Sequence, residues 1–217
     1  VGGLVCGFCL FCGYAFQNFG LIQTSASKSA FITSVSVLMV PIILYLFNIQ
    51  QVKIRIWTAV ALATIGLYIL LDPRGGMMNW GDILTFGCAL GFAVHIIFQG
   101  YYVKKNVRIL PFFLVQAWVV VGLSFINSLL FEPVFAIWSP RLISALLVTG
   151  IAATFIAILL MIWAQQILNP SETAIIFAME PVFASLFAMV FAAEFLGMWG
   201  YFGGGLVVLA VAFGKSG

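Results

Sequence analysis

One acidic residue, Glu180, stands in the middle of an apolar stretch of the sequence and is followed directly by Pro181. The stretch covers residues 173–193, and Glu180 lies three residues from its centre. If this stretch crosses a bilayer, an ionised carboxylate there costs roughly 2.5–3.5 kcal/mol on insertion scales. The chemistry expected of Glu180 is therefore binding of a proton or of a cationic group. The alternative is a carboxyl group that only satisfies the backbone broken by Pro181.

The single histidine, His95, also lies inside an apolar stretch, residues 83–103. An imidazole in such a place can carry a proton or form a hydrogen bond with a substrate. It can equally be a neutral side chain that bridges two helices. The spacing of the sequence leaves both interpretations open.

Hydroxyl side chains recur at helical spacing along one face of the stretch 29–47, at Ser29, Thr33 and Ser36. They predict either the lining of a polar cavity or contacts that hold helices together, because Ser and Thr serve both purposes in membranes. Proline removes a backbone hydrogen bond, so Pro41 and Pro181 predict helix kinks. Further candidates for substrate binding, each of which also suits simple packing, are Gln17, Gln99, Trp163, Tyr14, Asn18 and Gln116.

The four cysteines do not form a convincing metal site. Cys6, Cys9 and Cys12 are spaced three apart in an uncharged run, Cys88 is distant in sequence, and a fourth ligand near the first three is absent. Free cysteine behaves as a small apolar residue, so we interpret them as packing residues. The sequence predicts neither a metal ion nor a cofactor.

The composition indicates which kind of molecule must position these residues. Of the 217 residues, 64% are hydrophobic and 7% are charged, whereas soluble domains carry about 25% charged residues. A soluble fold could not cover so much apolar surface, so the expected surroundings are a lipid bilayer. The net charge of +3 comes from short clusters between apolar runs, which does not suit nucleic-acid binding.

The apolar runs have the length of membrane helices, for which about 20 residues are needed. No run alternates with a period of two, as the strands of a barrel would. The sequence predicts an all-α integral membrane protein, a bundle of eight transmembrane helices over residues 2–22, 29–47, 56–71, 83–103, 109–131, 142–165, 173–193 and 195–214.

The basic residues predict how the bundle is oriented. Successive connections alternate between the two membrane faces, and the face with more Lys and Arg is expected to be cytoplasmic. One face receives Lys53, Arg55, Lys104, Lys105, Arg108 and Lys215, and the other receives Lys28, Arg74 and Arg141. We therefore expect the first face, with the C-terminus, to be cytoplasmic.

An internal repeat predicts inverted topology. Sliding the chain along itself until Ser25 falls on Asn169 places three helices on three others without a gap, and we call this shift the repeat offset. Because the triplets begin an odd number of helices apart, they should cross the membrane in opposite directions. We expect 29–47 and 173–193 to lie beside the axis that relates the repeats. Two helices precede the second triplet and none precedes the first, so we expect a further helix pair before Val1.

Three segments resemble a known family. GLIQTSASKSAFITSVSVLMVPI at 20–42, Asn79-Trp80-Gly81-Asp82 with GCALGFAVHIIFQGYYVKK at 87–105, and AIIFAMEPVFASLFAMVFAAEFLG at 174–197 resemble signatures of the EamA-like branch of the drug/metabolite transporter superfamily. In this comparison Glu180-Pro181 and Glu194 take expected places. The resemblance covers essentially the whole chain.

The resemblance implies ten helices in two inverted repeats around a central cavity. Residues 1–72 would be the last three helices of the first repeat, and residues 82–215 the whole second repeat. It implies a multi-pass plasma-membrane transporter, an exporter or exchanger of small metabolites such as amino acids or drugs, with protons as a candidate coupling ion. The oligomeric state stays open.

Other classes of function fit the sequence less well. An intramembrane enzyme needs a nucleophile–base pair, clustered carboxylates or a zinc motif, and the membrane runs contain none. A channel needs a pore ring or filter, and no repeated one is visible. Within the superfamily, a nucleotide-sugar exchanger would need basic residues in its cavity, for which Lys28 is the only indication.

Overall fold

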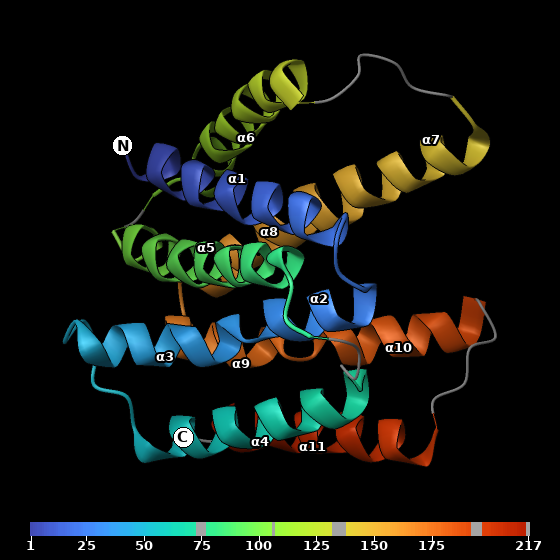
Figure 1. Ribbon diagram of the computed structural model, residues 1–217. Helices are drawn as coiled ribbons and strands as arrows, with labels where there is room; N and C mark the ends of the chain where they lie inside the picture. The colour runs from blue at the N-terminus through green and yellow to red at the C-terminus, as the bar shows by residue number, and fades with distance from the viewer. Residues whose placement is uncertain (73–76, 106, 132–137, 192–196, 216–217) are drawn as a thin grey trace.

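The computed structural model describes residues 1–72, 77–105, 107–131, 138–191 and 197–215, and these ranges contain helices and turns but no strand. Most of the helices lie in near-parallel layers, whereas α6 and the stretch from α7 to α8 run obliquely to them (Figure 1). Arg74 and Glu194, as well as the side chain of Lys215, fall outside the described residues.

The helices are, in chain order, α1 (Gly2–Leu21), α2 (Ala26–Ser34), α3 (Ser36–Leu46), α4 (Ile54–Leu71), α5 (Trp80–Val103), α6 (Ile109–Phe131), α7 (Pro140–Leu147), the π-helix η1 (Val148–Ile156), α8 (Ala157–Ala164), α9 (Pro170–Phe177), α10 (Glu180–Phe191) and α11 (Met198–Lys215).

Seven stretches of the described chain are long and apolar enough to cross a membrane, by length and composition. Three of them combine neighbouring helices: α2 with α3, α7 with η1 and α8, and α9 with α10. The sequence predicts eight spans, and the eighth is present as α11. The described apolar part of α11, Met198–Gly214, is shorter than the seven membrane-length stretches. The number of described helices that meet the length required to span a membrane is therefore seven.

Polar caps fix the starts of four helices. Asn79 accepts a hydrogen bond from the backbone of Asp82, whose side chain accepts one from the backbone of Asn79, so the pair forms a capping box at α5. Asn169 and Glu172 form the same box at α9. Ser25 and Ser139 accept bonds from the first turns of α2 and α7. Such caps satisfy amide groups that helix ends leave unpaired.

The helices approach closely where glycines face each other. A Cβ atom added at Gly203 of α11 would lie 2.7 Å from the carbonyl oxygen of Gly66 in α4. A Cβ atom at Gly81 of α5 would lie 2.6 Å from the carbonyl oxygen of Gly20 in α1. Small residues therefore set the packing of these two helix pairs, as is usual between membrane helices.

The layers seen in Figure 1 follow from these pairs. α4 and α11 form one outer layer, α2–α3 and α9–α10 form the next, and α5 with α1 lies beyond them, with α6 outermost. Two apolar cores fill the space between layers. One lies between α4, α11 and α9, around Val60, Ile175 and Val207, and the other lies among α1, α3, α5, α6 and α8.

The helix ends reproduce the repeat offset found in the sequence. The caps Ser25 and Asn169 are related by it, and α4 (Ile54–Leu71) corresponds to α11 (Met198–Lys215) at both ends. Along the chain, α2–α3 and α9–α10 run in opposite directions through the layer that they share (Figure 1). The assignment of residues 1–72 and 82–215 to two repeats remains a prediction.

Candidate functional site

Two membrane stretches contain a tightened turn near their middles, where the backbone stays right-handed helical but regular α-helix is interrupted. We call these positions breaks, and they are also related by the repeat offset. The first break is at Val35, between α2 and α3, and the second covers Ala178 and Met179, between α9 and α10. Pro181 explains the second break, because its ring clashes with the carbonyl four residues earlier and it donates no hydrogen bond. Pro41 lies inside α3, which continues through it, six residues after the first break.

Glu180 is the first residue of α10 and therefore stands directly at the second break. Glu180 is an exposed residue, and the helix that it begins contacts α4. The carboxyl group is therefore accessible at the break.

Tyr14 packs α1 against α5. Its ring meets the ring of Phe92 in α5 edge to face, with the centroids 5.7 Å apart. A further irregular segment is the π-helix η1, between α7 and α8. Short π-helical segments inside membrane-length helices frequently occur at functional sites.

The hydroxyl stripe of α2 and α3 borders the same site. Thr33 contacts the sulfur of Cys88, with 3.7 Å between Oγ1 and Sγ. Ser36 is the first residue of α3 and is 8% exposed, and the repeat offset pairs it with Glu180. Ser29 is 1% exposed, and its hydroxyl has no hydrogen-bond partner among the described residues. The predicted stripe is thus largely buried. The repeat offset pairs its last member, Ser36, with Glu180.

His95 belongs to a second polar group, farther along α5. Its Nε2 atom forms a 2.9 Å hydrogen bond with Oε1 of Gln116 in α6, and both side chains are buried. It lies seven residues after Cys88, about 10 Å along the helix. Gln165 donates a bond of 3.1 Å to the carbonyl oxygen of Ile96. The imidazole thus bridges two helices, one of the two interpretations that the sequence left open.

The remaining candidates are distributed more widely. Gln99 is fully buried on α5, and within the described part of the chain neither polar atom of its amide group has a partner. Gln17 is half-buried on α1, and Trp163 on α8 is 58% exposed. Sequence reasoning overlooked Gln165, which stands at the end of an otherwise apolar run. Its polar side chain was the available signal.

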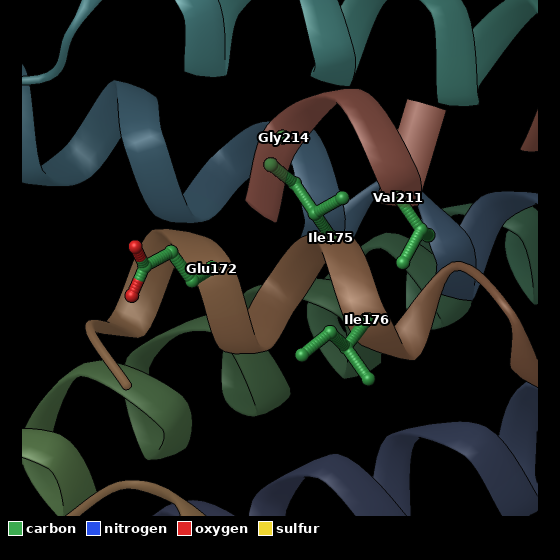
Figure 2. Close-up of a pocket in the computed structure, with 5 residues that line it drawn as sticks. All are labelled: Glu172, Ile175, Ile176, Val211 and Gly214. Carbon is green, nitrogen blue, oxygen red and sulfur yellow. The ribbon is translucent and has the colours of Figure 1, made fainter. Parts of the chain in front are cut away.

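A small crevice lies away from Glu180, between α9 and α11. Figure 2 shows Glu172, Ile175, Ile176, Val211 and Gly214 around it. Its volume of about 10 Å³ suffices for roughly one water molecule. Glu172 is already engaged in the capping box of α9. The crevice is therefore too small for a metabolite, and the described residues contain no group of three His, Cys, Asp or Glu side chains that could hold a metal ion.

Comparisons with known proteins identify the family and the fold. Residues 79–213 match the EamA-like transporter family. A protein from Archaeoglobus fulgidus described as an uncharacterized transporter is 37% identical over 210 residues, which are 96% of this chain and 67% of that protein. The match to one solved structure, described as a crystal structure of a protein, covers 98% of this chain and 76% of the chain in that structure. The TM-score is 0.83 at 16% sequence identity, so the two chains share the same fold. The protein is a multi-pass membrane protein that belongs to the EamA-like transporter family.

Proposed function

We propose that this protein is a secondary-active exporter of small metabolites, such as amino acids or drugs, and that it works by alternating access. The observation that carries the proposal is the pair of broken helices, whose breaks correspond at the repeat offset and precede α3 at Ser36 and α10 at Glu180. Broken helices at the interface of inverted repeats form the substrate and ion sites of many secondary transporters. Ser36 and Glu180 would then face the substrate site.

Glu180 is the candidate for coupling transport to protons or for binding a cationic group of the substrate. It is accessible, and it starts the second half of an interrupted membrane stretch. Protonation removes most of the cost of roughly 2.5–3.5 kcal/mol for a charge in the bilayer. A neutral carboxyl group could therefore cross a closed, dry intermediate, whereas an ionised one would hold a cation.

The surroundings of the site favour neutral or cationic solutes over nucleotide sugars. A nucleotide sugar carries phosphates, and the protein would need unpaired basic side chains to bind them. Lys28 was the only indication of such a residue, and it is paired with Asp82 at 2.5 Å. Its charge is therefore balanced within the protein. An intramembrane enzyme gains no support from the site, and the family is one of transporters.

The remaining parts of the proposal concern orientation and assembly from repeats. We place the protein in the plasma membrane, with its C-terminus and the connection 47–53 cytoplasmic, because most basic residues gather at that end. We assign 1–72 to the first EamA-like repeat and 82–215 to the second. The helix ends that match at the repeat offset support this division.

The experiment is a flux screen with the protein reconstituted into lipid vesicles. Amino acids, cationic drugs and other metabolites are presented singly, with and without a pH gradient, and empty vesicles serve as the control. We expect a few related solutes to move faster than through empty vesicles, and faster still with the gradient. A protein that folds and moves none of them would contradict the proposal.

A further inference from the structure

An ion pair closes one end of the interface between α2 and α5. Lys28 in the first turn of α2 lies 2.5 Å from Asp82 in the first turn of α5. The side chain of Asp82 is fully buried, and that of Lys28 is 16% exposed. Thr24 donates a 2.6 Å hydrogen bond to the other oxygen of Asp82. The Asp82 carboxylate is thus held by a charge, a hydroxyl and the backbone of Asn79.

We call Thr24, Lys28, Asn79 and Asp82 the gate cluster. The side-chain nitrogen of Asn79, Nδ2, also donates a 2.8 Å hydrogen bond to the backbone carbonyl oxygen of Gln23. The cluster therefore ties the turn between α1 and α2 to the start of α5, two segments that are far apart in the sequence. Removing one partner of a buried ion pair leaves the other charge uncompensated, so loss of either charge should weaken the contact between α2 and α5.

The interface below the gate cluster contains further polar side chains. Farther into the membrane, Ser29 of α2 is buried without a hydrogen-bond partner among the described residues, and Thr33 contacts Cys88 of α5. Buried polar residues also continue along α5, at Asp82, Thr85, Cys88, His95 and Gln99. Their spacings of three, four and seven residues place them on one broad face of the helix.

The opposite end of α5 carries a weaker contact. Lys104 donates a 2.5 Å hydrogen bond to the side chain of Asn169, the cap of α9, and this contact is exposed. α5 is therefore tied to α2 at one membrane end and to α9 at the other. An exposed contact of this kind contributes little, because water competes with it. The contact between Lys104 and Asn169 is thus weaker than the ion pair between Lys28 and Asp82 at the other end of α5.

We propose that the Lys28–Asp82 ion pair is the gate at one end of the solute route, and that the route follows the buried polar face of α5 past Cys88. When the gate is closed, the ion pair is largely shielded from water and holds α2 to α5. When the gate opens, both charges become hydrated, and their hydration offsets the lost interaction energy of the pair. The change is therefore reversible. The inference rests on the proposed transport function and adds a route and a gate to it.

Cys88 provides a reporter inside the interface, since it is fully buried below the gate cluster. In a parent with Cys6, Cys9 and Cys12 changed to Ala, Cys88 is the only thiol. Asp82→Asn removes the charge of Asp82 while keeping its shape, and Lys28→Met removes the charge of Lys28. The control is Lys53→Met, which removes an exposed lysine outside the gate cluster. All are studied in lipid nanodiscs, with an anionic and a cationic membrane-impermeant thiol reagent in parallel.

We expect both gate variants to label Cys88 at least about tenfold faster than the parent, the factor given by a shift of roughly 1.4 kcal/mol in the opening equilibrium. The control should label at the parent rate with both reagents. If Lys28→Met does not fold, Asp82→Asn carries the test. Folded Asp82→Asn that labels at the parent rate would overturn the gate, as would equal acceleration in Lys53→Met. Labelling needs no substrate, so it fails or succeeds independently of the flux screen.

Discussion

At the scale of single residues, the hydrogen bond between His95 and Gln116 joins α5 to α6 inside the bundle. The side-chain nitrogen of Gln116 has no hydrogen-bond partner among the described residues, so the Gln116 side chain is held there by its bond to His95. A neutral imidazole suits this role, because one ring nitrogen can donate to the amide oxygen. We therefore expect His95 to contribute more to stability than to proton transfer.

His95→Leu should destabilise the protein by about 1–2 kcal/mol, because a buried amide loses its partner. The double variant with Gln116→Leu should recover part of this loss, since both polar groups are then removed. The measurement is unfolding of the two single variants and the double variant in mixed micelles, together with the pH dependence of transport. A folded His95→Leu protein that has lost its pH dependence would assign the proton to His95 instead.

For single residues, the sequence indicates which side chains are unusual for a membrane helix better than it indicates which side chains they contact. Glu180 stands out because an acid in an apolar run is rare, and its match with Ser36 follows from the repeat. The partner of His95 lies 21 residues away, in the next helix, and no periodicity indicates it. The contact between Thr33 and Cys88 depends likewise on how α2 lies against α5.

At the scale of helices, the two breaks have different causes. The break at Ala178 and Met179 directly precedes Glu180-Pro181, whereas the break at Val35 lies six residues before Pro41. Only the break in the second stretch is therefore explained by a proline close to it. Sequence reasoning predicts both prolines as kinks, but it could not show that the helix would continue through Pro41.

Pro181→Ala should join α9 to α10 by restoring a backbone hydrogen bond, and we expect it to raise stability while it slows transport. The reason is that a continuous helix would reorient the start of α10, where Glu180 stands. Pro41→Ala is the matched control, because α3 is already continuous there, and it should alter transport less. Thermal unfolding and flux assays on both variants provide the test. Equal transport by Pro181→Ala and the parent would show that the break is not needed.

Seven predicted helix starts lie within three residues of the observed ones, and the eighth, at residue 195, falls outside the described residues. Five starts are predicted too late for one reason. Each apolar run is counted from the first residue after a charge, at Lys28, Arg55, Asp82, Arg141 and Glu172. The helices begin earlier, four of them after polar caps, because a charged residue is easily accommodated in a first turn.

At the scale of the whole molecule, the connection 47–53 and the end of α5 lie at one end of the bundle, opposite the end at which α5 begins (Figure 1). Most of the basic residues gather at the first end, so it should be cytoplasmic. Single cysteines in place of Gln51 and Met77, both exposed, report on the two ends. In intact cells, an impermeant thiol reagent should label Met77→Cys rapidly and spare Gln51→Cys. The reverse pattern would invert the orientation.

The most direct measurement of the central claim is pH-gradient-driven accumulation by Glu180→Gln in reconstituted vesicles, beside the parent and Glu180→Asp. Gln keeps the shape of the side chain and fixes its charge at zero. We expect a folded Glu180→Gln protein to lose accumulation or binding of a cationic solute, and Glu180→Asp to retain a reduced rate because its carboxyl group is set back by one methylene. If folded Glu180→Gln accumulates solute at the parent rate with the same pH dependence, the carboxyl group is structural and the account is wrong.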